Sequence, residues 1–396
     1  MLRLAKVVAS IVPLALLVGC GESSDGASPK SDAGTGGGAG SGGAQDGGGS
    51  GGASGGSGGT AGSGGTAGSG GTAGSGGGAA QRPSYNTGTG FFVLDGKLYD
   101  ANGVEFRPRG VNKVHYDLPS PGIVKSHANV ERWVVYDFSK TAENQAVMQG
   151  IIDNHIVPMP GAWEGTCKTD SATLSSMVDT WVSQASIWNA YEKYMILNIA
   201  NEWGPSASDG AGWRDAYVSA IGKLRAAGYK CTISITSGGC GQDNGDLVQY
   251  AQQVFDADPE KNVIFDQHIY GGWANGGGQS WQTDLKTGLD ALENLNLVVM
   301  IGELGPGKNI GPSPTDIEPL TIVAEAEKRN IGWLAWAWDD NNLPGAKADD
   351  NWFSLTYDPA VGYASESPDD LTLFGKDIVL DSSLGLVALA KPATIF

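Results

Sequence analysis

The chain has 396 residues, of which 62 are glycine, and its formal net charge at pH 7 is -18, with a pI near 4.5. This acidic balance excludes nucleic acid as an expected partner, because phosphate backbones are bound by clustered lysine and arginine. The metal-binding spacings CxxC and HExxH and a nucleotide-binding fingerprint are absent from the sequence, so no cofactor is expected.

The first 20 residues predict an export signal with a lipid-attachment site. Arg3 and Lys6 precede an apolar run from Val7 to Val18, which is too short for a stable membrane span. The run leads into Gly19-Cys20 and resembles a bacterial lipobox, in which the cysteine is lipidated and becomes the new N-terminus. We therefore expect lipidation at Cys20 and a protein anchored at the bacterial cell surface or outer membrane, or an extracellular one. An ordinary signal peptide with an incidental cysteine is the alternative.

Residues 21–81 predict a flexible tether. They are rich in Gly, Ser, Ala and Thr, and the sequence Gly-Ser-Gly-Gly-Thr-Ala repeats between Gly56 and Ala73. Such a segment lacks the apolar side chains that would offset the entropy of folding. The expected organisation is thus a signal peptide (1–20), a disordered linker (21–81) and one catalytic domain (82–396). The protein is expected to be a monomer.

Residues 82–396 alternate strand and helix signals, which predicts an α/β fold, a (β/α)8 TIM barrel. A small β-hairpin cap is expected before the barrel, with strands Phe91–Leu94 and Lys97–Asp100 around the Asp95-Gly96 turn. The barrel strands are expected at Phe106–Asn112, Glu131–Tyr136, Ile156–Pro160, Met195–Ile199, Thr232–Thr236, Val263–His268, Leu297–Gly302 and Trp333–Ala337. Amphipathic helices are expected, among others, at Ala142–Asn154, Ser171–Ala190, Gly212–Ala227 and Ile317–Arg329.

Two of these apolar strands end on a glutamate. Asn201-Glu202 follows the fourth strand, and Glu303 follows the seventh. An unpaired charge at the end of a buried strand destabilises a core, and in this fold the carboxyl ends of the strands build the active site. The pair therefore indicates acid/base chemistry of the kind that glycoside hydrolases use. The alternative for Glu202 is a helix cap.

Three cysteines follow the signal. Cys167 and Cys240 are expected in loops at the C-terminal face of the barrel, and Cys231 at the start of a strand at the opposite end. In an exported protein one disulfide is expected. The pair Cys167–Cys240 is favoured, and the other two pairings stay open.

An ordered set of motifs resembles glycoside hydrolase family 5, and within it the bacterial endo-β-1,4-mannanases. The resemblance runs from about Phe92 to the C-terminus. Its motifs are Arg109-Gly-Val-Asn112 with His115, Ile199-Ala-Asn-Glu-Trp203, Val254-Phe-Asp-Ala-Asp-Pro259, His268-x-Tyr270, Gly302-Glu303, Gly332-Trp-Leu-Ala-Trp-Ala-Trp338 and Lys391-Pro-Ala-Thr-Ile-Phe396.

The resemblance implies roles for single residues. Glu202 corresponds to the acid/base and Glu303 to the nucleophile of a retaining mechanism. The implied substrate-binding residues are Arg132, which orients the nucleophile, Tyr270, which hydrogen-bonds it, His268 and His115 in the same pocket, Asn201 on the sugar 2-hydroxyl and Trp336 as the platform beneath the reacting sugar.

Three further tryptophans follow strand ends, and flat aromatic faces suit the apolar faces of sugar rings. Trp163, Trp203 and Trp273 are therefore each either a sugar contact or a packing residue.

Two loops depart from the mannanase pattern. After the third strand the relatives carry a histidine in a Val-His-Asp context, where this chain has Pro158-Met-Pro-Gly-Ala-Trp-Glu164. After the fifth strand they carry an aspartate and, four residues on, a tryptophan, where this chain has Thr236 and Cys240. The expected function is a retaining endo-β-1,4-glycanase, first of all a mannan endo-1,4-β-mannosidase acting on a β-linked polysaccharide. The alternatives are a cellulase or xylanase on the same scaffold, or a non-catalytic, tethered polysaccharide-binding barrel.

Overall fold

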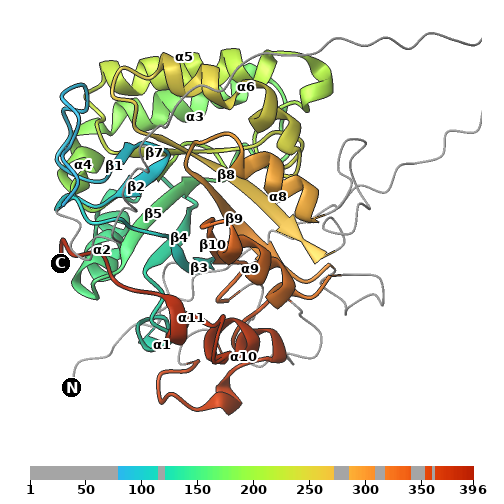
Figure 1. The fold of residues 1–396 in the computed structure, drawn as a ribbon. Helices are drawn as coiled ribbons and strands as arrows, with labels where there is room; N and C mark the ends of the chain where they lie inside the picture. The colour runs from blue at the N-terminus through green and yellow to red at the C-terminus, as the bar shows by residue number, and fades with distance from the viewer. Residues whose placement is uncertain (1–78, 115–120, 272–284, 308–316, 340–352, 359–361) are drawn as a thin grey trace, which may run out of the picture. The chain divides into compact units, whose positions relative to one another are not determined.

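The computed structural model describes residues 79–114, 121–271, 285–307, 317–339, 353–358 and 362–396 (Figure 1). They form a closed barrel of eight parallel strands in the order β10-β3-β4-β5-β6-β7-β8-β9, which confirms the (β/α)8 prediction. The strands are β3 (Arg109–Lys113), β4 (Val130–Val135), β5 (Val157–Ala162), β6 (Ile196–Asn198), β7 (Thr232–Thr236), β8 (Val263–Tyr270), β9 (Val299–Gly305) and β10 (Gly332–Ala335). The predicted signal peptide, Cys20 and nearly all of the predicted linker lie outside the described residues.

Helices surround the ring of strands (Figure 1). Their apolar faces pack against the outward-facing strand residues, including Trp133, Leu197 and Phe265, in the main hydrophobic core. The helices are α1 (Pro121–Lys125), α2 (Thr141–Asp153), α3 (Ser171–Ser183), α4 (Ala185–Trp188), α5 (Gly212–Ala226), α6 (Asn244–Ala257), α8 (Leu285–Glu293), α9 (Pro319–Lys328), α10 (Leu373–Leu380) and α11 (Leu386–Leu389), with short 3-10 turns η1 (Asn189–Tyr191), η2 (Ala207–Asp209) and η4 (Pro368–Asp370). No helix among the described residues combines the length and apolar composition that a bilayer span requires.

The floor of the barrel is a second apolar cluster. The antiparallel hairpin β1 (Phe92–Leu94) and β2 (Lys97–Tyr99) confirms the predicted cap. Val93 and Leu98 of this hairpin join the C-terminal Ala393 and Ile395 and the first inward residues of the strands, such as Ile196. The apolar floor leaves the other end of the barrel interior free for polar side chains.

Several predicted element ends were wrong by two or more residues. The first barrel strand begins at Arg109 and not at Phe106, because the Phe106 N–H donates to Leu98 of the hairpin and so belongs to the cap. The predicted helix from Ser171 to Ala190 is split at Gln184, where the backbone leaves helical geometry. β8 and β9 run past their predicted ends because parallel pairing continues, with His268 opposite Glu303 and Tyr270 opposite Gly305.

Candidate active site

Strand geometry brings five predicted site residues together at the C-terminal end of the barrel. Arg132 lies on β4, His268 and Tyr270 on β8 and Glu303 on β9, and Glu202 follows β6. Side chains two residues apart on a strand share a face, so His268 and Tyr270 both reach the barrel mouth. All five are linked by contacts shorter than 3.5 Å, through Glu303 and His268.

The carboxylate of Glu303 is fixed by donors on both oxygens. Arg132 Nη1 donates to Oε1 at 2.8 Å, and the Tyr270 hydroxyl donates to Oε2 at 2.6 Å. His268 Nδ1 lies 3.3 Å from Oε2. Glu303 is 3% exposed, so water has little access to compete for these donors. This is the fixed orientation that an attacking carboxylate requires.

Glu202 lies opposite in a different environment. Its backbone is left-handed, with φ of 48°, and its Oε1 is 2.8 Å from His268 Nδ1. Burial raises the pKa of Glu202, and the nearby Glu303 carboxylate raises it further, while His268 and Arg132 act in the opposite direction. A raised pKa suits a group that must carry a proton before it donates it.

The spacing of the two carboxylates favours one stereochemical outcome. One oxygen of Glu202, one of Glu303 and a nitrogen of His268 all lie within 4.8 Å of one another. Retaining glycosidases place the two carboxyl groups about 5–5.5 Å apart, whereas inverting enzymes need about 6.5–9.5 Å to admit a water molecule. The same three residues could in principle hold a metal ion, but the His268 nitrogen that faces both carboxylates would first have to lose its proton.

Arg132 is the centre of a buried polar layer. It is 0% exposed, and besides Glu303 it donates to Asn112, Asn198 and Asn201. The Asn201 side-chain amide in turn donates to Thr166 at 3.0 Å. Of these partners, Asn201 was predicted as a site residue. Asn198 was not predicted, although a polar residue inside the apolar run Met195–Ile199 is a sequence signal for one.

Asp266 is the site residue that sequence reasoning missed. It is 0% exposed, and its Oδ1 lies 3.5 Å from His268 Nε2, on the far side of the ring from Glu202. A Cβ at Gly302 would lie 1.8 Å from Asp266 Oδ1, so the glycine makes room for this carboxylate. The available signal was an acidic residue two positions before His268, which places both on one face of β8.

His268 is consequently held as a cation. Burial would lower the pKa of His268, but the carboxylates of Glu303 and Asp266 and the hydrogen bond to Glu202 raise it to about 10. Although burial would raise the pKa of Asp266, the charges of His268 and Arg132 hold it below its ordinary value. Negative and positive side chains thus alternate across the site, in the order Asp266, His268, Glu303 and Arg132.

This cation predicts a pH-dependent stability. A histidine whose pKa rises from 6.5 to about 10 on folding stabilises the native state fully below pH 6.5 and loses that contribution as the pH rises toward 10. Between pH 6.5 and 8.5 we expect the free energy of unfolding to fall by about 2 kcal/mol. Urea unfolding at both pH values measures it, and the Cys231 thiol of the unfolded chain, half ionised at pH 8.5, adds only roughly 0.4 kcal/mol to the decrease.

Two variants test the assignment to His268. In His268→Gln the decrease between the two pH values should largely disappear. His127→Asn is the matched control, because His127 is an exposed histidine with φ of 64°, a conformation that asparagine tolerates. It should keep the wild-type decrease, and a decrease that persists in His268→Gln would contradict the assignment.

The predicted tryptophans separate into two groups. Trp163 and Trp336 are partly exposed and stack at the mouth, with ring centroids 5.8 Å apart and an interplanar angle of 24°. The Arg132 guanidinium carbon lies 4.5 Å from the Trp163 ring centroid. The interpretation of Trp203 as a sugar contact was wrong: it is 1% exposed, donates to the Asp170 carbonyl and packs edge-on against Tyr217. Predicted His115 and Trp273 lie outside the described residues.

The cysteine prediction is confirmed. Cys167 and Cys240 form a disulfide between the loops after β5 and β7, and Cys231 is a buried free thiol directly before β7. Both loops border Glu202.

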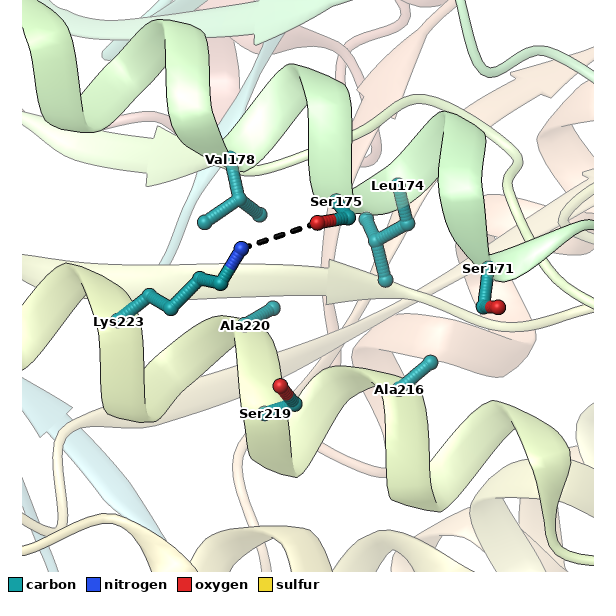
Figure 2. Close-up of a pocket in the computed structure, with 8 residues that line it drawn as sticks. All are labelled: Ser171, Leu174, Ser175, Val178, Ala216, Ser219, Ala220 and Lys223. Atoms are coloured by element: carbon teal, nitrogen blue, oxygen red, sulfur yellow. Dashed lines mark hydrogen bonds between the residues drawn. The ribbon is translucent and has the colours of Figure 1, made fainter.

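A separate hollow lies on the outside of the barrel. It is a groove of about 220 Å³ between α3 and α5. Lys223 reaches across it and donates to the Ser175 hydroxyl (Figure 2). Its lining residues are short side chains and Lys223, and none of them belongs to the cluster around Glu202. The chemistry therefore lies at the barrel mouth.

Comparison with known families agrees with this geometry. The family model described as "Cellulase (glycosyl hydrolase family 5)" matches residues 135–342, more than half of the chain.

The chain belongs to glycoside hydrolase family 5.

Individual relatives resemble it over most of their length. A mannan endo-1,4-beta-mannosidase of Salipaludibacillus agaradhaerens is 32% identical over 78% of this chain and 96% of its own. A mannan endo-1,4-beta-mannosidase of Streptomyces lividans is 28% identical over 78% of both chains. Among solved structures, the catalytic domain of a mannanase from Streptomyces sp. SirexAA-E has a TM-score of 0.64 and 27% identity, and the match covers 80% of this chain and 98% of that one. The protein is thus a glycoside hydrolase.

Proposed function

We propose that the protein is a retaining endo-β-1,4-mannanase in which Glu303 is the nucleophile and Glu202 the acid/base. The observation that carries the mechanism is the carboxylate pair within 4.8 Å, with Glu303 fixed on both oxygens and Glu202 beside a cationic histidine. The substrate class rests on relatives that are named mannan endo-1,4-beta-mannosidases along 78% of this chain.

The reaction follows from these positions in two steps. In the first, an oxygen of Glu303 attacks the anomeric carbon, the bond to the leaving-group oxygen breaks, and Glu202 gives its proton to that oxygen. In the second, Glu202 accepts a proton from a water molecule, whose oxygen attacks the anomeric carbon and releases the Glu303 carboxylate. The anomeric configuration is inverted twice and therefore retained.

The surrounding residues would each lower the barrier in a particular way. Arg132 and Tyr270 hold Glu303 in the line of attack. Asn201, held by Arg132 and Thr166, is positioned to bind the sugar 2-hydroxyl, a contact that strengthens toward the oxocarbenium-like transition state. Trp336, stacked on Trp163, would support the apolar face of the reacting sugar.

The choice of glycan is the open part of the proposal. Trp163 takes the place of the histidine after the third strand, and Cys240 that of the tryptophan after the fifth. Trp163 lies over the Arg132 guanidinium, and Cys240 is bonded to Cys167, which contacts Glu202. Both departures are therefore near the site, so β-1,4-glucan and xylan are alternative substrates. A tethered binding barrel is disfavoured because binding alone requires neither the paired glutamates nor the donors that orient Glu303.

The experiment is reducing-end release by the full-length protein from β-mannan, with cellulose and xylan in parallel. Release from mannan with little from the other two is the expected result. Release from cellulose or xylan instead would keep the mechanism and replace the substrate. No release from any of them would favour the binding barrel.

We also propose that residues 1–20 export the chain, that Cys20 carries the lipid and that residues 21–81 tether the enzyme, on the sequence pattern alone. Cys20→Ala should move the protein from the membrane fraction to the soluble one, because acyl chains supply the membrane affinity. Cell fractionation with immunoblotting measures this, with Cys231→Ala as the cysteine control. A Cys20→Ala protein that stays in the membrane fraction would refute the anchor.

A further inference from the structure

The Cys167–Cys240 disulfide lies directly against Glu202. The Cys167 sulfur is 3.9 Å from Glu202 Oε2, the carboxylate oxygen that His268 does not contact. A disulfide sulfur has no proton to donate, so this contact is a van der Waals contact that shields the oxygen from water. The bridge spans 73 residues of sequence.

On one side, the loop after β5 is bonded to the segment that carries Glu202. The Asn201 N–H donates to Ala162 at 2.7 Å, Cys167 donates to the Glu202 carbonyl at 3.2 Å, and Gly204 donates to Lys168 at 2.9 Å. Three successive contacts therefore align the loop along residues 201–204.

On the other side, the loop after β7 closes over the same segment. The Gly239 N–H donates to Gly204 at 3.0 Å, and the Gly241 carbonyl accepts from the His268 N–H at 2.8 Å. A Cβ at Gly241 would lie 2.8 Å from His268 Nδ1 and 3.1 Å from Glu202 Cγ, so this loop has room for nothing larger than glycine there. The disulfide joins the two loops across Glu202.

Glu202 needs such restraint because of its backbone. With φ of 48° it occupies the left-handed region, which costs a residue other than glycine roughly 1–3 kcal/mol and persists only when its surroundings fix it. Cys167 and Cys240 are themselves left-handed, with φ of 56° and 55°. Without a covalent link, the two loops and Glu202 could relax together.

We propose that the Cys167–Cys240 disulfide is a positioning element for the acid/base: it holds the Glu202 carboxyl at the leaving-group oxygen and keeps one face of it dry. The inference rests on the proposed role of Glu202. The disulfide acts through that residue.

The test compares two leaving groups. A mispositioned acid slows departure of a sugar alcohol, which needs a proton, but hardly affects a dinitrophenolate, which leaves without one. For Cys167→Ser/Cys240→Ser we expect kcat/KM on the hydrolysed polysaccharide to fall about tenfold or more, and on the dinitrophenyl glycoside of the matching disaccharide less than about threefold. The basic limb of the polysaccharide pH profile should also shift to lower pH, because a wetter Glu202 loses its proton more readily.

Controls separate the possible failures. Cys231→Ser removes a cysteine outside the bridge and should leave kcat/KM unchanged on both the polysaccharide and the dinitrophenyl glycoside. Glu202→Gln should show the same leaving-group contrast in a larger form; if it does not, the proposed role of Glu202 fails. Suppose that Glu202→Gln loses more kcat/KM on the polysaccharide than on the dinitrophenyl glycoside, as expected. If the double variant then loses activity equally on both substrates, or keeps full activity on both, only the disulfide proposal is overturned.

A second measurement covers a double variant that does not fold. Cys167 is exposed, so the bridge of the folded wild-type protein is open to a phosphine reductant, and mass spectrometry after alkylation counts the released thiols. The reduced enzyme should show the same contrast between the two substrates. If reduction leaves the rate on each of the two substrates unchanged, the proposal is overturned.

Discussion

Glu303→Gln should lower kcat on the polysaccharide by about four to six orders of magnitude, because it removes the nucleophile while the fold remains. Glutamine matches glutamate in shape: its amide oxygen can accept the Arg132 hydrogen bond, and its NH2 group, in place of the second oxygen, can donate to the Tyr270 hydroxyl. An amide does not form the covalent glycosyl-enzyme intermediate at a useful rate. Initial rates of reducing-end release measure the loss, and circular dichroism and thermal melting verify the fold.

The matched control is Glu143→Gln, an exposed glutamate on α2 whose surface ion pair with Lys140 contributes little. It should retain wild-type rates. Substantial activity in Glu303→Gln would mean that another group attacks the sugar, and the proposed mechanism would be wrong.

Glu202→Gln should lower kcat/KM on the polysaccharide by about two to four orders of magnitude and remove the basic limb of its pH profile. The sign follows from the role: the acid must be protonated in the first step, so activity falls as the pH rises through the pKa of Glu202. Because burial raises that pKa, the limb of the wild-type profile should lie above the usual glutamate range. Profiles of kcat/KM, which report the free enzyme, measure this.

Glu366→Gln is the matched control for the second variant. Glu366 is also left-handed, with φ of 60°, but it lies on the surface beside Lys125. It should keep both the rate and the basic limb. A basic limb that survives unchanged in Glu202→Gln would assign the titration to another group.

The sequence predicted the barrel and its central residues because the signals there are local and strong. Apolar strands that stop at a polar residue mark both the parallel sheet and its functional edge, which is why Glu202 and Glu303 could be paired from sequence. The resemblance to family 5 added Arg132 and Tyr270, whose contacts with Glu303 no pattern within β4 or β8 reveals.

The sequence predicted Trp203 wrongly and missed Asp266 because tertiary contacts decide where these two side chains lie. Trp203 follows a strand end as Trp163 does, but the chain turns at Gly204 and carries the indole into the core, where its N–H finds the Asp170 carbonyl. Asp266 was overlooked because a buried carboxylate is favourable only beside His268, and β8 read alone does not show that contact.

The floor of the barrel joins the two ends of the folded chain. Asp100 accepts from both the N–H and the hydroxyl of Thr394, and the ring of Phe396 stacks on Tyr194. β10 also closes the ring against β3, more than 200 residues earlier. Contacts this distant in sequence form late in folding, because the loop between them must be ordered first.

The floor of the barrel is therefore complete only when Ala393 and Ile395 are in place. A nascent chain that lacks its final residues leaves Ile196 and the other floor residues open to water, whatever strands have already paired. Losing this apolar burial should lower the free energy of unfolding, so removal of residues 391–396 should destabilise the barrel.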